Sequence, residues 1–500
     1  MLRASKPRTK TRGGTLIHLP LPIGVGLAAG GACALAAGIV GLILDPDRFS
    51  FDRVSELVLG LASLAIGATL ARSRPLGRPS RAKAMAMFVA GWVAMTFVAV
   101  VVFLVAGEVN TPLEAVFEAV SASTTTGFTS VSDPSQLSHS FRFLRVILPW
   151  TTGLGVLMVA MGVLPTAIGG AELLPKRQLG RERQLVTTVP VAIRNILGMY
   201  LLLTVALIVG YGLAGMGAFD ALTYALSTAS TGGMANHADS LGHFDSVAVE
   251  WVAAVGMAAA GGNLLVVWWG LRGRFEAVWR STELRLYLII LAGGFVAVLL
   301  GSDLSASDSA VAITSMLSTT GLHSANWGAA ASFVPAVLFV ATGIGAMSGS
   351  VGSGFRQARV ARIALEVRRS LRKLLDPHRV GIVRVDGEAV KEDSLELTIG
   401  YLWMHAFTLA GLALLIYTPD LDLVATLSLA VSIVSNSGVL LDGTQVTNTV
   451  ALSGWSQIVA AFGMLLGRLS IYPVLITAAG FGRWIARLRP HDRIGAGAEL

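Results

Sequence analysis

The stretch Ser123-Thr124-Thr125-Thr126-Gly127-Phe128-Thr129-Ser130-Val131 decides the fold, because it brings hydroxyl side chains and a glycine directly after an apolar segment. These residues favour an extended or irregular backbone, and glycine also permits positive φ and close approach. At membrane depth such backbone is tolerated only where it is buried in protein or lines a water-filled path. Its carbonyl oxygens are then free to replace the water around a cation. A single stretch of this kind is more commonly a polar loop between helices.

Three related stretches follow it: Ser230-Thr231-Gly232-Gly233, Ser318-Thr319-Thr320-Gly321 and Ser435-Asn436-Ser437-Gly438. The glycines taken as central, Gly127, Gly232, Gly321 and Gly438, are separated by 105, 89 and 117 residues. Each stretch follows a short, mostly apolar segment compatible with a helix, and each precedes a polar turn and another apolar span. This pattern predicts an internal repeat that places four loops around one axis. Four unrelated loops are the alternative.

The composition is that of an integral membrane protein. Of the 500 residues, 54% are hydrophobic and only 14% are charged, and the mean hydropathy is +0.69, whereas a soluble chain is about a quarter charged. Many windows exceed the ~18 apolar residues that cross a bilayer, and 56 glycines suit close helix packing. The single cysteine, Cys33, lies in an apolar span, so no intrachain disulfide can form.

The apolar segments divide the chain into five predicted parts: 1–83 with a cytoplasmic tail and two spanning helices, then four pore repeats at 84–192, 193–282, 283–394 and 395–500. Each repeat reads as helix, short half-helix, filter and helix. Spanning helices are expected at 18–44, 52–72, 84–106, 140–170, 193–214, 246–271, 284–301, 333–365 (broken), 395–418 and 451–486, and half-helices at 112–124, 217–229, 307–318 and 421–435. The fold class is therefore all-α and membrane-embedded, with a pseudo-fourfold central pore.

Charge supports this topology independently. Of the 38 Lys and Arg residues, 34 fall in segments 1–16, 72–83, 176–194, 272–285, 356–391 and 468–493. The positive-inside rule makes these segments cytoplasmic, with both termini inside and the filters near the outer face. The net charge of +8 thus reports topology and indicates no nucleic-acid partner. The mixed-charge stretch 366–394 is either a solvated connector or a docking surface for a soluble partner.

The repeated unit resembles the Trk/Ktr/HKT family of potassium transporters over about residues 84–486. Thr124 to Phe128 resembles the first filter of that family, and Ser230 to Met234, followed by His237, resembles the second. Further matches are Pro149-Trp150 through Gly153-Leu154-Gly155, Leu164-Pro165, Gly169-Gly170-Ala171-Glu172, Gly349-Ser350-Val351-Gly352-Ser353 and Gly467-Arg468-Leu469. The resemblance implies a homodimer, and a bacterial cytoplasmic (inner) membrane is expected because no organellar transit peptide is visible. The resemblance also implies a separate cytosolic regulatory subunit with Rossmann-like nucleotide-binding domains.

The chain departs from the family pattern at several places. After Ser353 it has Gly354-Phe355-Arg356 where the family usually has Thr-Ala-Gly-Gly-Ile-Lys, and Ser470 replaces an acidic residue. The third and fourth filters also lack the Asn-x-Gly-x-Gly pattern of many relatives. These departures bear on gating and partner identity more than on ion conduction.

Potassium is the expected ion, held by carbonyl oxygens at and just before the four glycines. Each half-helix would end at its filter and turn its negative dipole end toward the cation path. The resemblance also favours potassium, since a serine at the first glycine position accompanies sodium transport in plant relatives. The predicted filter residues are Thr125, Thr126, Gly127, Ser230, Thr231, Gly232, Thr319, Thr320, Gly321, Asn436, Ser437 and Gly438.

A gate is expected below the filter. The resemblance assigns it to a flexible intramembrane loop, and the predicted gate residues are Gly349, Ser350, Gly352, Ser353, Gly354 and Arg468. A packed helix kink is the alternative for the loop. An intramembrane arginine is costly and indicates function, so Arg468 is predicted to face the pore and slow cation passage. Its alternative is an arginine that snorkels to the inner interface.

Other classes of function find little support. His237 and His323 have no metal-ligand spacing nearby, so the sequence predicts no transition metal. It also shows no hydrolase triad, Walker A motif or dinucleotide fingerprint, which predicts no cofactor in this chain beyond the transported ion. A sodium- or proton-coupled secondary transporter would require paired intramembrane acids, and a membrane enzyme would require clustered His, Asp or Glu. The apolar spans are nearly free of Asp and Glu, which disfavours both alternatives. Membrane lipid is expected to surround the spans.

Overall fold

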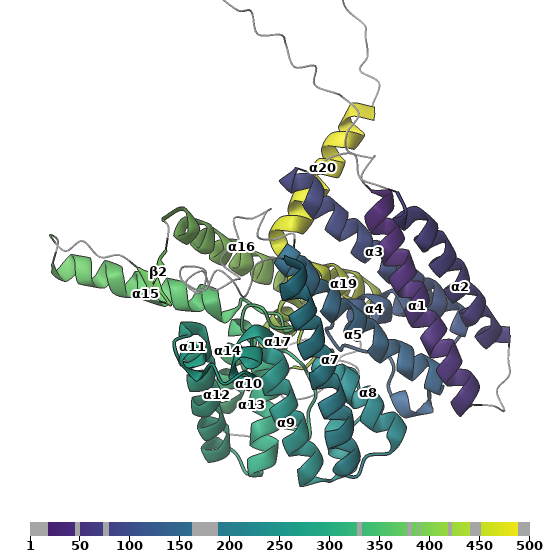
Figure 1. Ribbon diagram of the computed structural model, residues 1–500, viewed down its shortest axis with the longest axis horizontal. Coiled ribbons are helices and arrows are strands. Elements are labelled where there is room, and N and C mark those ends of the chain that lie inside the picture. Colours follow the sequence, from purple (N-terminus) through teal and green to yellow (C-terminus); the bar gives the residue numbers. More distant parts are fainter. Residues whose placement is uncertain are drawn as a thin grey trace, which may run out of the picture.

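The computed structural model describes residues 19–45, 51–73, 80–162, 189–327, 333–376, 378, 383–386, 388–390, 392–418, 423–440 and 452–488. Helices make up most of it (Figure 1). Within these ranges the one strand pairing is antiparallel, between β1 (Arg384–Val385) and β2 (Glu388–Ala389). The expected motifs at 164–165 and 169–172, and both chain termini, lie outside the described residues.

Two helices precede the first half-helix unit, as predicted. They are α1 (Pro20–Leu44) and α2 (Phe51–Ala71), which stand beside α3 (Arg81–Ala106) at the edge of the bundle (Figure 1). Glycines seven residues apart form the contact face, with Gly24 and Gly31 on α1 against Gly60 and Gly67 on α2. A methyl group on Gly31 would lie 2.6 Å from the backbone nitrogen of Leu64. The two backbones therefore touch, as in other glycine-mediated membrane helix pairs.

Four short helices lie where the sequence predicts half-helices: α4 (Pro112–Ser123), α8 (Ala218–Ala229), α13 (Ala306–Ser318) and α17 (Leu423–Ser435). At 12 or 13 residues each, they reach about 18–20 Å, which is too short for the ~30 Å hydrocarbon core. Hydroxyl caps start two of them: Thr111 Oγ1 accepts from Glu114 N, and Ser305 Oγ accepts from Asp308 N.

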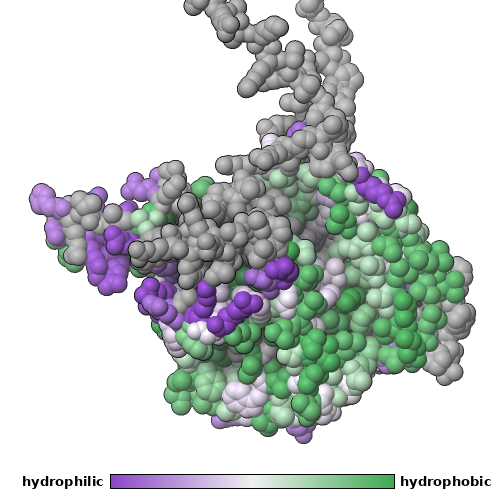
Figure 2. All heavy atoms as spheres, in the orientation of Figure 1, coloured by the Kyte–Doolittle hydropathy of each residue, from purple (hydrophilic) through white to green (hydrophobic). Residues whose placement is uncertain are grey.

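Seven described helices are long and apolar enough to cross a membrane. Besides α1, α2 and α3, they are α5 (His139–Gly162), α7 (Val189–Leu213), α12 (Thr282–Gly301) and α16 (Glu392–Ile416). Hydrophobic side chains cover much of the face shown in Figure 2. The short connecting helices are η3 (Pro134–Gln136), η6 (Ser240–Phe244) and α11 (Phe275–Trp279).

The prediction of continuous helices at 246–271 and 451–486 is wrong. The first is broken into α9 (Val247–Gly261) and α10 (Leu264–Leu271) with a bend of 108°, and the second into α19 (Gly454–Leu469) and α20 (Ile471–Leu488) with a bend of 111°. Asn263 causes the first break by capping α10, since its Oδ1 accepts from Leu265 N at 2.9 Å. Ser470 ends α19 with a φ of 65°. Counting each bent pair as one, the described chain has up to nine spans that are long and apolar enough to cross a membrane, and the broken segment 333–365 is not among them.

The eighth expected segment, 333–365, is interrupted as predicted. It consists of α14 (Phe333–Ile344), an irregular segment at 345–356, and α15 (Gln357–Leu375). α15 projects from the bundle beside α16 (Figure 1) and carries hydrophilic side chains (Figure 2). The stretch 366–394 thus holds the end of α15, a small strand pair and the start of α16.

The glycine contact between α1 and α2 predicts that Gly31→Leu destabilises the protein. The added side chain meets backbone that cannot rotate away, and overpacking of this kind costs roughly 1–3 kcal/mol. The expected result is a lower midpoint of thermal unfolding in detergent. Size-exclusion chromatography after heating to increasing temperatures measures that midpoint. Gly411→Leu is the control, because a methyl group on Gly411 meets no atom within 4 Å. Equal midpoints for the two variants would contradict the packing described.

Candidate functional site

The four half-helices end in the same way. One residue just after each of these helices has a left-handed backbone: φ is 55° at Thr125, 51° at Thr231, 58° at Thr319 and 53° at Asn436. The next residue donates its N–H to the carbonyl five residues earlier: Thr126 to Ser121 at 2.9 Å, Gly232 to Ser227 at 2.8 Å, Thr320 to Ser315 at 2.9 Å and Ser437 to Ser432 at 3.0 Å. This is the Schellman termination of a helix. It occurs here with threonine or asparagine in place of the usual glycine.

That shared geometry corrects the register of the second repeat. Two residues after each left-handed residue comes a glycine with positive φ: Gly127, Gly233, Gly321 and Gly438, at 87°, 67°, 86° and 71°. The equivalent of Gly127 is therefore Gly233 and not Gly232, and Ser230 matches Thr124 rather than Thr125. A sequence signal was available, because a serine lies six residues before each of these glycines: Ser121, Ser227, Ser315 and Ser432.

The four segments meet one another in a closed ring. A methyl group on Gly127 would lie 2.9 Å from the carbonyl oxygen of Gly232. On Gly233 it would overlap the carbonyl oxygen of Thr320, on Gly321 that of Ser437, and on Gly438 that of Thr126. Each repeat thus packs its glycine against the carbonyl that precedes the glycine of the next repeat. All twelve residues predicted for the filter are buried at this junction.

Several side-chain oxygens at the ring have no hydrogen-bond partner within the described chain. They are Thr125 Oγ1, Thr231 Oγ1 and Asn436 Oδ1. Asn436 Nδ2 does donate, to Thr126 Oγ1 and to the Met464 carbonyl, both at 2.9 Å. Buried oxygens without donors are unfavourable unless something else satisfies them. Oxygen atoms of this kind are suitable ligands for a hard, dehydrated cation.

The predicted gate loop lies directly against the third filter segment. Ser353 donates its N–H to Thr319 Oγ1 at 2.9 Å. A methyl group on Gly352 would overlap the carbonyl oxygen of Ser318. Positive φ at Gly345, Gly349 and Gly354 turns the chain back on itself. The structure therefore brings the predicted gate glycines into contact with the predicted filter.

The same loop is tied to the break between α9 and α10. Met347 N donates to the Gly261 carbonyl at 3.0 Å, and Asn263 Nδ2 donates to the Ser348 carbonyl at 2.7 Å. On the other side, Glu283 Oε1 accepts from Ser348 N at 2.5 Å and from Ala358 N at 3.1 Å. Sequence reasoning identified neither Asn263 nor Glu283. These bonds hold in place a segment whose glycine content alone indicates flexibility.

Arg468 contacts the loop rather than the interface. Its side chain is 4% exposed, and Nη1 donates to the Val351 carbonyl at 2.8 Å and lies 3.0 Å from Ser353 Oγ. The alternative of a snorkelling arginine is therefore excluded. Nε and Nη2 have no hydrogen-bond partner among the described residues. Arg468 joins the end of α19 to the residues directly below the ring.

The sequence analysis also did not identify the buried ion pair of Glu118 and Arg145, which lies next to the first filter segment. Glu118 is fully buried in α4, and its Oε2 lies 3.3 Å from Nε of Arg145, which is 2% exposed. The available signal was an acidic residue in the middle of a short half-helix, beyond its first turn.

The two histidines after filters two and three are packed polar groups. His323 is buried, and its carbonyl accepts from Leu241 N at 2.9 Å. His237 stacks on His243 with ring centroids 3.6 Å apart, and its Nε2 lies 3.5 Å from Asp220. Burial lowers the pKa of His237 below its ordinary value, so the ring is neutral at pH 7. In the part of the chain that the structure describes, no three His, Cys, Asp or Glu side chains are placed to share a metal ion.

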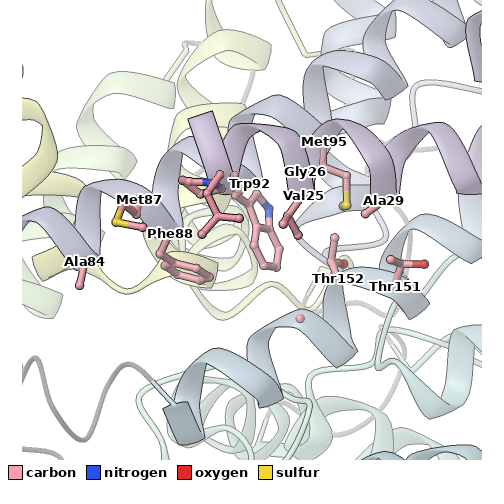
Figure 3. A pocket seen from close by; sticks show the side chains of 14 residues that line it. Val25, Gly26, Ala29, Ala84, Met87, Phe88, Trp92, Met95, Thr151 and Thr152 are labelled. Atoms are coloured by element: carbon pink, nitrogen blue, oxygen red, sulfur yellow. The ribbon is translucent and has the colours of Figure 1, made fainter. Parts of the chain in front are cut away.

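An apolar cavity of about 390 Å³ lies apart from the ring. Residues of α1, α3 and α5 line it, including Val25, Met95 and Thr152 (Figure 3). No filter or gate residue is among them.

Comparison with known proteins agrees with this architecture. The TrkH family profile, described as a cation transport protein, matches residues 61–305 and 301–481. TrkH of Salmonella typhimurium, a Trk system potassium uptake protein, is 27% identical over 83% of this chain and 89% of its own length. TrkI of Halomonas elongata, named in the same way, is 27% identical over 89% of this chain and 92% of its own.

A solved structure has the same fold. The crystal structure of the potassium transporter TrkH from Vibrio parahaemolyticus superposes with a TM-score of 0.79 at 24% identity, and covers 92% of this chain and 98% of that one. The helices, the re-entrant half-helices and the profile match define an integral membrane transport protein. The chain belongs to the TrkH family of cation transport proteins.

The corrected register yields a test that separates two adjacent glycines. Gly233→Ala is expected to abolish transport, because it strains a positive φ and drives a methyl group into the Thr320 carbonyl. Gly232→Ala is expected to be milder, because its methyl group meets only side chains, those of Pro149 and Ser230. Cation uptake by cells or proteoliposomes measures both. A greater loss for Gly232→Ala would contradict the register.

Proposed function

We propose that this chain carries potassium into a bacterial cell across the inner membrane, with the glycine–carbonyl ring as its selectivity filter. The closed ring made by Gly127, Gly233, Gly321 and Gly438 is the observation that carries the proposal. The curated relatives named above are potassium uptake proteins, which supports the choice of ion.

The physical argument concerns dehydration. A cation entering a narrow path loses its water, and a ring of backbone carbonyls replaces it. The carbonyls of Thr126, Gly232, Thr320 and Ser437 lie where the segments meet. All four half-helices end at the ring, so their negative dipole ends add attraction for a cation.

The loop at 345–356 acts as the gate in this proposal. It lies against the inner end of the third filter segment through Ser353 and Thr319, and Arg468 holds it there. Opening requires these bonds to break. A homodimer and a cytosolic nucleotide-binding regulatory subunit, which the family resemblance implies, belong to the proposal, with α15 as a candidate contact for that subunit.

Coupled transport of another solute has no comparable support. The buried acid Glu118 is paired with Arg145, and Glu283 accepts from two loop amides. Neither forms the carboxylate pair that the coupled alternative predicts.

The direct test is ⁸⁶Rb⁺ uptake into proteoliposomes with potassium or sodium as competitor. Potassium is expected to compete strongly and sodium weakly. Gly127→Ser is expected to weaken that preference by about tenfold, because a side chain at a positive-φ ring position displaces the carbonyls. Absence of rubidium uptake by the unmodified protein, or equal competition by both ions, would refute the proposed function.

Removal of the Arg468 side chain is expected to raise uptake several-fold. The change deletes the donor to the Val351 carbonyl, and a charge-assisted hydrogen bond contributes roughly 1.5–3 kcal/mol. Arg468→Ala is compared with Arg280→Ala, whose exposed side chain pairs with Glu276 on α11. Initial rates of rubidium influx measure the effect. Equal rates in Arg468→Ala and the unmodified protein would argue against a gating role.

A further inference from the structure

Three of the four repeats tie the segment that leaves the ring to a carboxylate on their own half-helix. The third residue after the ring glycine makes the bond in each case. Ser130 N donates to Glu118 Oε1 at 2.5 Å, Asn236 Nδ2 to Asp220 Oδ1 at 2.8 Å, and Ser324 Oγ to Asp308 Oδ1 at 2.6 Å. In the fourth repeat the matching position, 441, lies outside the described residues.

The first repeat uses a deeper carboxylate than the other two. Asp220 and Asp308 lie in the first turn of α8 and α13, and both are partly exposed. Glu118 lies farther along α4 and is 0% exposed. The matching residues of the other repeats are Tyr224, Ala312 and Leu429, so only the first repeat has a buried charge at this position.

Glu118 fixes consecutive residues beyond Gly127. Its Oε1 accepts from Thr129 Oγ1 at 2.6 Å, from Ser130 N at 2.5 Å and from Ser130 Oγ at 3.2 Å. Ser121 Oγ, from the same helix, donates to the Phe128 carbonyl at 2.6 Å. The backbone leaving the ring is thereby bonded to α4 from residue 128 to residue 130.

Arg145 makes that arrangement possible in a buried site. An isolated carboxylate would be neutralised there, because burial of an unpaired charge is strongly unfavourable. The guanidinium, contributed by α5, lies 3.3 Å from Oε2 and places an opposite charge beside the buried carboxyl group. The carboxyl oxygens have only donors as neighbours, three on Oε1 and the guanidinium on Oε2, which suits a carboxylate that acts as an acceptor.

We propose that Glu118 and Arg145 are positioning residues for ion selection, and that their charge pair holds the Thr126 and Gly127 carbonyls at the separation that prefers potassium to sodium. The inference rests on the proposed function of the ring. The first repeat contacts both neighbours, since Gly127 packs on Gly232 and Gly438 packs on Thr126. A displacement of this one segment therefore alters two of the four ring contacts.

The experiment replaces the charge and keeps the shape. In Glu118→Gln, the amide N–H₂ group faces either the donors of Thr129 and Ser130 or the guanidinium of Arg145. In either orientation one donor then faces another donor, so at least one hydrogen bond is lost. In rubidium uptake by proteoliposomes, the expected result is a fall of about tenfold in the potassium-to-sodium preference. Glu114→Gln is the matched control: the same change on the same helix, at a first-turn acid that accepts from Asn110 N instead. It is expected to keep the preference of the unmodified protein.

A second variant covers the case in which Glu118→Gln does not fold. Thr129→Val removes one donor to Glu118 without unpairing Arg145, and a smaller fall in the same preference is expected. Size-exclusion chromatography checks folding of each variant.

The possible outcomes distinguish a failure of the proposed role of Glu118 and Arg145 from a failure of the proposed potassium transport. An unchanged preference in either folded variant overturns the inference, and so does a lower total uptake at an unchanged preference, because that marks a purely structural role. If the unmodified protein shows no preference for potassium, the proposed function fails first and the inference fails with it.

Discussion

The structure depends on one contact repeated four times: a left-handed glycine packed against the carbonyl oxygen of the next repeat. A Cβ at any of these positions is strained, because it would lie within 2.9 Å of a carbonyl oxygen and the φ values are positive. The contact closes into a ring only if the four half-helices end at the same level. Their common Schellman termination, with the bond from the residue before each glycine to the carbonyl five residues earlier, provides that level.

Other elements lie against the ring and hold it in place. The breaks at Asn263 and Ser470 turn two helices sharply close to it. The Asn263 break bonds to the loop at 345–356, and Arg468 at the end of α19 bonds to the same loop. The irregular backbone is thus buried in protein and hydrogen-bonded, which is the condition for its presence at membrane depth.

Much of this could be predicted from the sequence because it depends on local pattern. The half-helices were predicted to within a few residues, since an apolar run that ends at hydroxyl residues and a glycine signals both the helix and its end. The interruption of 333–365 was predicted from its glycines together with the resemblance of Gly349 to Ser353 to the intramembrane loop of the family. The family profile and the Vibrio parahaemolyticus structure agree with the predicted class.

The features that were missed depend on contacts between distant residues. Gly232 and Gly233 are adjacent, and the serine six residues before each ring glycine is the sequence signal that favours Gly233. The N–H bond to the Ser227 carbonyl and the sign of φ then identify Gly233 as the ring member. Asn263 reads as an ordinary polar residue until its bonds to α10 and the loop are seen. The partner of Glu118 is 27 residues away in the chain, and that of Arg468 is 117 residues away, so neither pairing follows from sequence periodicity.

The central claim is that the four carbonyls of Thr126, Gly232, Thr320 and Ser437 hold a monovalent cation. The most direct measurement is anomalous diffraction from crystals grown in rubidium. The account predicts an anomalous peak on the axis of the ring, within coordination distance of those four oxygens. Rubidium bound only at other sites, with no peak at the ring, would contradict it.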